Sequence, residues 1–351
     1  MKNLPEVRVS LTRIYEMSLA SVQTNAMTAG VKLAIFDRLG KPIRAKELAE
    51  TCGFDAGTTA EYLNVLTACG LVIKKDGFYQ NSPEAEQYLV TGSPTYYGDL
   101  ILLEYERLAM SPNEIAERVK NGSISQKKDE DMSSEDFWIQ YARSMANWER
   151  SGTAQTLADT IAALPEFSSM RKMLDLGGGP GLMGIAILSR HPSMEAVLFD
   201  QPAVVNVTKE FIAEYGLSER MTTIDGDYLN DPIGSGYDLV LASCTLNFAK
   251  DCMDEMVKKI YNALNPGGVF VSLHDGMYNE GTAPAVHVLN MMSSAISGYN
   301  CSLRKGLIAD ATLNAGFQSV RAQSVRLDVG LFDLDIARKA PKRRASERRE
   351  D

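Results

Sequence analysis

The sequence predicts an α/β protein in which a Rossmann-like, doubly wound sheet with an antiparallel edge strand follows a mainly α-helical domain of winged-helix outline. Three observations predict this fold class. Short apolar runs alternate with helical patterns in the second half of the chain, which is typical of a parallel sheet covered by helices. A glycine-rich turn follows the first of these runs. The first hundred residues show helical periodicity that ends in a two-stranded pattern.

The N-terminal part reads as three helices followed by a ribbon. Apolar residues recur at helical spacing over 17–39, and shorter helices are expected at 44–52 and 57–69. Strand patterns at 71–74 and 78–80 flank a Lys-Asp-Gly turn. We assign residues 1–110 to this winged-helix-like domain and 111–165 to a connecting helical segment. Within that segment we expect an exposed polar connection over 112–134, followed by helix from 134 to 164.

Residues 166–337 are expected to form the doubly wound domain. Its predicted strands cover 172–176, 196–199, 221–224, 237–242 and 269–273, and its predicted helices cover 181–190, 203–215, 252–264 and 303–315. Two later runs, 317–322 and 325–331, would close the sheet as an antiparallel edge. The last 14 residues, 338–351, hold seven basic and three acidic side chains. We interpret them as a solvated, disordered tail.

Charge disfavours a nucleic-acid-binding protein in spite of the winged-helix outline. The chain has a formal net charge of −9, which repels nucleic acid and anionic membranes. Residues 1–110 contain 11 basic and 13 acidic side chains, and the helix 57–69 that would enter a DNA groove carries a glutamate but no Arg or Lys. A DNA-binding regulator is therefore the weaker alternative. Apolar helix faces that bind another protein chain are the better interpretation.

Composition also bounds the location and the metal chemistry. No apolar run is long enough to span a membrane, and the N-terminus has no secretory apolar core. The five cysteines form no CxxC pair, so we expect free thiols in a reducing cytoplasm. Three histidines are too few for a multi-histidine metal centre, and no metal is expected.

The strongest motif is the run Leu-Asp-Leu-Gly-Gly-Gly-Pro-Gly-Leu-Met-Gly at 174–184. A buried strand enters a glycine turn that opens a helix, and glycine lets the backbone turn sharply and approach a ligand closely. Asp175 lies just before Gly177 and Gly179, where its carboxylate can receive backbone or ligand donors. The segment 179–184 also matches GxGxxG, so a dinucleotide oxidoreductase is a competing hypothesis. However, Pro180 removes an N–H that a pyrophosphate would use.

Acidic side chains follow the next two predicted strands. Asp200 ends the second strand, where an acidic residue suits a ribose diol. Asp227 and Tyr228 follow the third strand and could hold the amino group and the face of an adenine. Carboxylates around a nucleoside, without Arg or Lys for phosphates, indicate a cationic ligand such as S-adenosylmethionine.

With these motifs the sequence resembles a known family. The runs LDLGGGPG, LFDQP, GDY and NPGG are similar to those of S-adenosylmethionine-dependent small-molecule methyltransferases of the plant and bacterial O-methyltransferase type. The resemblance implies a homodimer formed through the N-terminal domain. It also implies cofactor contacts by Gly177 and Gly179, ribose binding by Asp200 and adenine binding by Asp227 and Tyr228. Ser243 stands at a further position that can face the cofactor.

One departure from the family concerns the general base. The family usually has a histidine after the fourth strand, and Asn247 stands at the matching position here. An amide can orient a nucleophile but cannot accept its proton at neutral pH. His274, followed by Asp275, is the best substitute as base. O-methylation is the default expectation; S- or N-methylation of an acceptor that needs no base, such as a small thioether or thiol acid, is the alternative.

The walls of the acceptor pocket are expected to come from two helices. Tyr141, Arg143 and Trp148 lie on the helix before the glycine turn, and Met291 lies on the helix after His274. Arg143 could pair with a carboxylate of the small-molecule acceptor, although a surface salt bridge is an equal alternative. Methionine and aromatic residues at helical spacing are often plain core.

Overall fold

The computed structural model describes residues 3–123 and 134–342. The chain divides into two compact units, Met1–Glu106 and Arg107–Asp351, and each is described by itself. The sequence analysis places the corresponding boundary at residue 110. Helix α5 (Gly98–Leu108) contains the division.

The first unit combines helices with a small antiparallel sheet. Its other elements are α1 (Thr12–Lys32), β1 (Ile43–Arg44), α2 (Ala45–Cys52), α3 (Ala56–Ala68), β2 (Val72–Lys75), β3 (Phe78–Asn81) and α4 (Pro83–Tyr88). The sheet order is β1-β3-β2. The helices bury a core that includes Leu39, Leu48, Leu63 and Leu66.

The first helix differs from the predicted range 17–39. It starts earlier and ends at Lys32, because Ala34 adopts a left-handed backbone with φ of 49°. A single 3-10 turn, Phe36–Arg38, follows the break and turns Phe36 into the core. Apolar periodicity continues across such a break, so the pattern alone merges the two segments.

The second unit contains the large sheet. Its helices are α6 (Pro112–Asn121), α7 (Glu135–Trp148), α8 (Ala154–Ala162), α9 (Leu182–Ser189), α10 (Pro202–Glu214), α11 (Met253–Ala263), α12 (Ala285–Ile296) and α13 (Leu307–Ala315). Its strands are β4 (Lys172–Leu176), β5 (Glu195–Asp200), β6 (Met221–Asp225), β7 (Tyr237–Ser243), β8 (Leu264–His274), β9 (Ser319–Leu327) and β10 (Gly330–Arg338). The predicted strands of the parallel part are therefore confirmed within a few residues.

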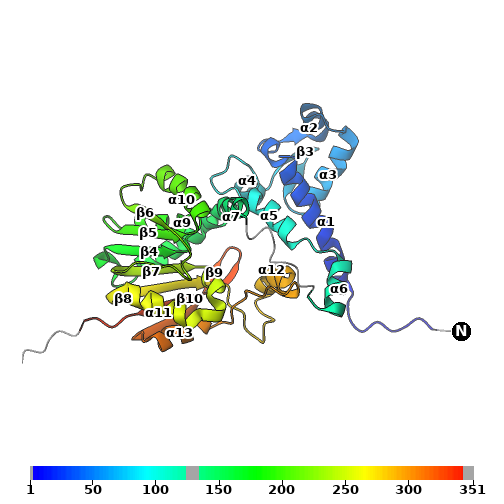
Figure 1. Ribbon diagram of the computed structural model, residues 1–351. Helices are drawn as coiled ribbons and strands as arrows, with labels where there is room; N and C mark the ends of the chain where they lie inside the picture. Colours follow the sequence, from blue (N-terminus) through cyan, green and yellow to red (C-terminus); the bar gives the residue numbers. More distant parts are fainter. Residues whose placement is uncertain (1–2, 124–133, 343–351) are drawn as a thin grey trace, which may run out of the picture. The chain divides into compact units, whose positions relative to one another are not determined.

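The strand order is β6-β5-β4-β7-β8-β10-β9 (Figure 1). Strands β6 to β8 are parallel, and β10 pairs antiparallel with both β8 and β9. After β6 the chain returns to place β7 beside β4, so the order reverses between β4 and β7. A crevice for ligands opens at such a reversal, outside the carboxyl ends of the strands.

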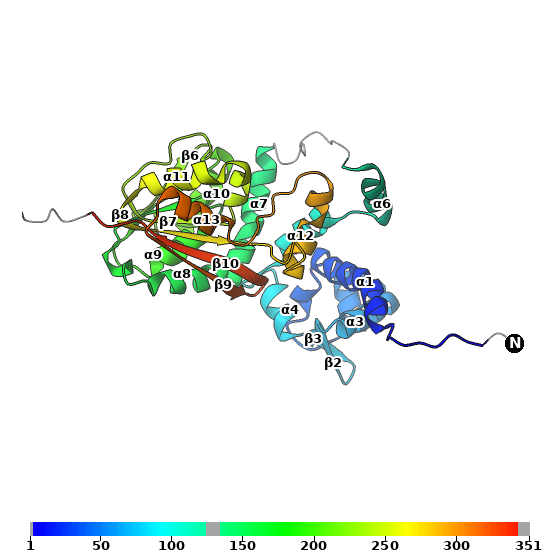
Figure 2. The same cartoon turned by 90° about the horizontal axis from the view of Figure 1, so that it is seen from below.

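The closing hairpin extends further than the sequence predicts (Figure 2). The turn between its two nine-residue strands falls after Leu327, so the predicted range 325–331 straddles the turn instead of forming a strand. Arg338, which the sequence analysis assigns to the tail, pairs with Val269 and Ser319 in the sheet. Residues 343–351 of the predicted tail lie outside the described residues.

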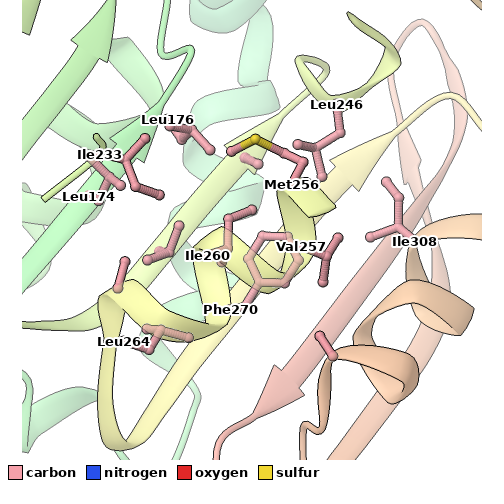
Figure 3. Packing of buried hydrophobic residues seen from close by; sticks show 14 of the residues in the cluster. Leu174, Leu176, Ile233, Leu246, Met256, Val257, Ile260, Leu264, Phe270 and Ile308 are labelled. Carbon is pink, nitrogen blue, oxygen red and sulfur yellow. The ribbon is translucent and has the colours of Figure 1, made fainter. Parts of the chain in front are cut away.

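The core of the second unit lies between the sheet and the pair α11 and α13. Phe270 of β8 is fully buried there against Val257 and Ile260 of α11 and Ile308 of α13 (Figure 3). Helices α8 and α9 pack against each other, and α10 packs against α7 and contacts β5 and β6. The glycine turn and the ends of β4, β5 and β7 are thus held by buried packing.

The polar segment 112–134 contains a helix that the sequence analysis does not predict. Helix α6 begins with a capping box, in which the Ser111 hydroxyl accepts from the Glu114 N–H and the Glu114 carboxylate accepts from the Ser111 N–H. None of its residues is buried, and the Ser-Pro-Asn-Glu capping pattern at 111–114 is the sequence signal that could have identified it. Residues 124–133 of the same stretch lie outside the described residues. Within residues 3–123 and 134–342, no helix has the length and apolar character needed to cross a bilayer.

Candidate active site

A cavity of about 670 Å³ lies in the second unit at the carboxyl ends of β4, β5, β6 and β7. Its volume falls in the range of small-molecule sites. The glycine turn after β4 forms one side, and residues of α7 form another. The cavity therefore occupies the place where the strand order predicts a ligand.

Gly177 begins the turn. Its backbone conformation disfavours any residue with a side chain, and the space beside it has no room for a Cβ. Its φ is +61°, and an added Cβ would lie 2.0 Å from the Thr245 Oγ1. Thr245 is itself fixed, because its hydroxyl lies 2.8 Å from the Tyr228 hydroxyl, which also donates to the Thr245 carbonyl at 3.0 Å. The loops after β4, β6 and β7 consequently meet in one contact beneath the cavity.

Asp200 ends β5 and ties the glycine turn to the neighbouring strand. Its Oδ2 accepts from the Gly179 N–H at 2.8 Å, and its Oδ1 accepts from the Gln201 N–H at 2.7 Å. Burial raises the pKa of this carboxyl, although the two backbone donors oppose the rise. The Thr208 hydroxyl donates to the Gly179 carbonyl at 2.7 Å. The carboxylate is oriented and keeps lone pairs for a ligand.

Asp227 and Tyr228 stand after β6 on the same side of the cavity. The Asp227 carboxylate accepts from the Leu229 N–H at 3.0 Å and from the Asn230 side chain at 2.6 Å. Asp227 is exposed, whereas Tyr228 is partly buried. Both line the cavity.

Two buried carboxyl groups cap the N-terminus of α9. The Met183 N–H donates to the Glu149 Oε2 at 3.1 Å, and the Gly184 N–H donates to the Asp175 Oδ2 at 3.1 Å. A helix N-terminus is otherwise a natural anion site. Since the chain's own carboxyl groups already take these donors, a pyrophosphate would find them occupied and would be repelled.

The charges around the cavity are all of one sign. Four acidic side chains line it: Glu149, Asp175, Asp200 and Asp227. No Lys, Arg or His stands among the described lining residues. Burial raises the pKa of Asp175 to about 7. Burial, and secondarily the nearby Asp175, raise the pKa of Glu149 well above its usual range. Such a site favours a cationic ligand.

Three buried polar atoms at the cavity wall have no hydrogen-bond partner among the described residues. They are the Asp175 Oδ1, the Ser243 Oγ and the Trp148 Nε1. A buried polar group left unpaired costs free energy, and native structures rarely retain one without a reason. A carboxyl oxygen, a hydroxyl that can donate or accept, and an indole donor are thus available to a ligand that carries both donors and acceptors, such as a nucleoside joined to an amino acid.

Aromatic rings of α7 and of the segment after β7 form another part of the cavity wall. Trp138 of α7 meets Phe248 edge to face at 6.0 Å and Tyr141 at 5.9 Å between ring centroids. Trp148 packs against Phe332 of β10 at 5.9 Å. The cavity therefore offers carboxylates on one side and flat apolar surfaces on the other.

Comparison with known proteins agrees with this geometry. Residues 126–298 match the O-methyltransferase domain, and residues 15–91 match the O-methyltransferase dimerisation domain. The chain belongs to the S-adenosylmethionine-dependent O-methyltransferase family. It is an enzyme of this type that acts on a small-molecule acceptor, and S-adenosylmethionine is its cofactor.

Individual relatives share low sequence identity with this chain but align with it over most of its length. The chain is 26% identical to the 3-hydroxy-5-methyl-1-naphthoate 3-O-methyltransferase of Streptomyces sahachiroi, over 88% of this chain and 90% of the relative. It is also 26% identical to the N,N-dimethyltransferase OxyT of Streptomyces rimosus, over 84% and 87%. The human N-acetylserotonin methyltransferase, solved in complex with the cofactor, shares the fold with a TM-score of 0.77 at 19% identity, over 96% of this chain and 100% of that one.

Asn247 of this methyltransferase does not line the cavity, contrary to its predicted catalytic position. Its side-chain amide lies against the carbonyls of Cys244 and Thr245; with the amide nitrogen turned toward them, it donates to both, at 3.1 and 3.2 Å. The turn that it closes contains Cys244, whose φ of 51° is unusual for a residue with a side chain. In this structure Asn247 supports a strained loop.

The structure also corrects the role predicted for His274. This side chain ends β8 with 2% of its surface exposed, and it does not line the cavity. Its Nε2 lies 4.0 Å from the Asp333 Oδ2 of β10, and burial lowers the pKa of the imidazole. Lys305 lies 3.1 Å from the other Asp333 oxygen. A histidine held neutral within the sheet is not placed to accept a proton from an acceptor in the cavity.

Two predicted wall residues lie elsewhere. Arg143 forms an exposed ion pair with Glu210 of α10 at 2.8 Å, which is the surface salt bridge that the sequence left as an alternative. Met291 is surrounded by Ser294 and Cys301, whose side chains approach its sulfur at 4.0 and 3.9 Å. Tyr141 and Trp148 do line the cavity.

The cavity residues that sequence reasoning did not assign to the site include Trp138, Glu149, Thr245 and Phe248. Glu149 is followed by Arg150, and such a pair on a helix normally indicates a solvated face. Phe248 stands one position after Asn247, and no pattern around it marks it as a cavity residue. The aromatic pattern on the helix from residue 134 was the signal that could have identified Trp138.

The contact between Gly177 and Thr245 predicts different effects for two glycines of the turn. Gly177→Ala and Gly179→Ala both impose a left-handed backbone on alanine, at about 1 kcal/mol each. Only Gly177→Ala also forces a Cβ into Thr245, because nothing lies within 4 Å of a Cβ at Gly179. We expect a further loss of about 1–3 kcal/mol in the free energy of unfolding for Gly177→Ala. Chemical denaturation without cofactor measures both, and equal losses would refute the Thr245 contact.

The buried His274 predicts a loss of stability in acid. Its folded-state pKa is depressed, so as the pH falls below about 6.5 the unfolded state takes up a proton that the folded state does not. Between pH 7 and pH 5 the native protein should lose up to about 2 kcal/mol more stability than His274→Gln. Denaturant titrations at both pH values test this. Parallel losses would show that His274 titrates normally in the folded protein.

Proposed function

We propose that this methyltransferase binds S-adenosylmethionine along the ends of β4–β7, with the adenosine toward β5 and β6. Asp200 receives the ribose hydroxyls, because each of its oxygens has one backbone donor and can accept another. Asp227 and Tyr228 bind the adenine. Gly177, Gly179 and Ser243 contact the chain beyond the ribose. The observation that carries this assignment is a lining with four carboxyl groups and no described basic side chain.

The acceptor that fits the remaining wall is a flat aromatic hydroxyl compound. Trp138, Tyr141 and Phe248 present aromatic edges and faces, which pack favourably against another ring. The relative from Streptomyces sahachiroi is named for a hydroxynaphthoate, which is such a compound. A thiol acid held by Arg143 lacks support, since that guanidinium pairs with Glu210.

Positioning is the main contribution of this chain to the reaction. When bound, the cofactor would supply an electrophilic methyl carbon; its transfer to an acceptor oxygen that has lost its proton to solvent would break the methyl–sulfur bond and leave S-adenosylhomocysteine. Neither Asn247 nor His274 lines the cavity, so the protein holds the acceptor near the methyl group and excludes water. Hydroxyl groups of low pKa are the preferred acceptors, because a larger fraction is ionised at neutral pH without a base.

Product analysis tests the proposed reaction. The protein is incubated with labelled S-adenosylmethionine and separate sets of aromatic hydroxyl compounds, aromatic amines and thiols, and the products are identified by mass spectrometry. Label in the ether of an aromatic hydroxyl is expected. Asp200→Asn should weaken cofactor binding by about tenfold or more, whereas Asp225→Asn should not, because Asp225 does not line the cavity. Label confined to amines or thiols would contradict the proposed acceptor.

We further infer a homodimer formed through the N-terminal unit. Residues 15–91 match a dimerisation domain, and α1 leaves a series of large apolar side chains exposed in the single chain. They include Ile14 at 67% and Val22 at 52% exposure. Apolar surface of this extent normally marks a protein interface.

The five cysteines are free, which supports a reducing compartment such as the cytoplasm.

The dimer predicts a clear effect of charge on α1. The double substitution Ile14→Glu and Val22→Glu places two carboxylates in the apolar interface and should shift the protein to monomers in sedimentation velocity. Lys46→Glu changes an exposed position on α2 and serves as the control. A dimer of unchanged stability in the double variant would exclude α1 as the interface.

A further inference from the structure

Glu149 occupies an unusual place in the backbone. Between α7 and α8 the chain forms a π-helical turn, Glu149–Thr153, in which Gly152 has φ of 113°. π-helical turns inside helices are frequent at functional sites. Here the turn directs Glu149 inward, where 5% of its surface is exposed, beside the N-terminus of α9. A carboxyl group so deeply buried needs a partner.

The adjacent cation does not provide it. Arg150 points away and lies 3.2 Å from Glu214, with its guanidinium over the rings of Phe211 and Tyr215. The titratable groups that influence Glu149 are Asp175 of β4, Arg150 of its own turn and, after β7, Cys244. Asp175 and Cys244 cannot offset the negative charge of Glu149, and Arg150 already pairs with Glu214. Backbone donors from α9 therefore stabilise Glu149, but no described side chain neutralises it.

Asp175 of β4 is in the same situation. One of its oxygens accepts from Gly184, and the other has no partner among the described residues. Both carboxyl groups line the cavity. Two acids that share a buried corner stay ionised together only when a cation enters between them.

The order of the strands indicates which cation this is. Asp227 follows β6, Asp200 ends β5, and Asp175 lies in β4, so the proposed adenosine contacts occupy the strands before β4. A cofactor that starts there and continues along the sheet edge brings its amino-acid end to β4 and Glu149. That end carries an ammonium group.

We propose that Glu149 is a cofactor-binding residue whose carboxylate, together with that of Asp175, receives the α-ammonium group of S-adenosylmethionine. The inference rests on the proposed placement of the adenosine and adds a contact at the other end of the molecule. It also accounts for the π-helical turn, which positions Glu149 between the cavity and α9. The S-adenosylhomocysteine product keeps the same ammonium group and should use the same contact.

A comparison of ligands and variants tests the proposal. Glu149→Gln keeps an oxygen that can accept from Met183 but removes the charge. Calorimetry measures the dissociation constants of S-adenosylmethionine, S-adenosylhomocysteine and the S-adenosylhomocysteine analogue in which hydrogen replaces the α-amino group. The variant should weaken the first two by about tenfold to a hundredfold and leave the third within about twofold. Glu214→Gln, at an exposed carboxylate, is the matched control and should change none of them.

A measurement on the unaltered protein covers the case of a variant that does not fold. A carboxyl group whose pKa is raised by burial ionises when the ammonium group arrives, so S-adenosylhomocysteine should release protons on binding near pH 7 and bind more tightly as the pH rises. The analogue without the amino group should release none. Calorimetry in buffers of different ionisation enthalpy measures this difference.

Each other outcome contradicts the proposal. Equal weakening of all three ligands by Glu149→Gln would indicate that Glu149 only caps α9. Weakening of S-adenosylmethionine alone would place the carboxylate at the sulfonium. Unchanged binding with an altered pH–rate profile would make Glu149 a base. If the unaltered protein binds neither S-adenosylmethionine nor S-adenosylhomocysteine, the placement of the adenosine fails, and this proposal fails with it.

Discussion

The electrostatics at the N-terminus of α9 determine what the cavity can bind. The first turn of a helix exposes N–H donors and a partial positive charge, which normally attract an anion. In this protein Glu149 and Asp175 accept from Met183 and Gly184 in that turn, so the chain itself supplies the acceptors for these donors. With Asp200 and Asp227 also lining the cavity, a cationic sulfonium cofactor fits where a pyrophosphate would not.

Backbone conformation and hydrogen bonds then hold the cavity in shape. Gly177 is packed against Thr245, and Asp200 is fixed by the Gly179 and Gln201 N–H groups. These contacts join the ends of neighbouring parallel strands, whose own positions are set by buried side chains such as Phe270 (Figure 3). The site is therefore built on the sheet and needs little adjustment from the loops.

The sequence was sufficient for the parts of the molecule that local pattern controls. Each parallel strand and the glycine turn could be predicted, because apolar runs and glycine spacing are local signals. Asp200, Asp227 and Tyr228 line the cavity as expected, since they directly follow strands whose ends share one edge. Helix α6 was missed because none of its side chains is buried. The closing hairpin was misplaced because apolar residues continue through its turn, between Leu327 and Gly330, without a break that the sequence marks.

The sequence was not sufficient to place the predicted catalytic and acceptor-binding side chains, because their directions depend on contacts between residues that are distant in the sequence. His274 follows a strand of the functional edge, but Asp333 and Lys305 from later elements surround it and place it outside the cavity. Arg143 turns toward Glu210, 67 residues away in sequence. Glu149 turns inward because of a π-helical turn that no periodicity reveals. In each case the direction of a side chain is decided by a partner or a backbone irregularity that the sequence does not display.

The self-capped helix also bears on how this fold diversifies. Exchange of Glu149 for a small neutral residue would release a backbone donor of α9 and remove one of the two buried acids in contact with that helix end. The freed N–H of α9 would then face a cavity that still holds Asp175, Asp200 and Asp227, and the cationic end of a ligand would lose one of the two acids at that helix end. One position in a connecting turn thus tunes recognition of the ligand's amino-acid end without any change in the sheet.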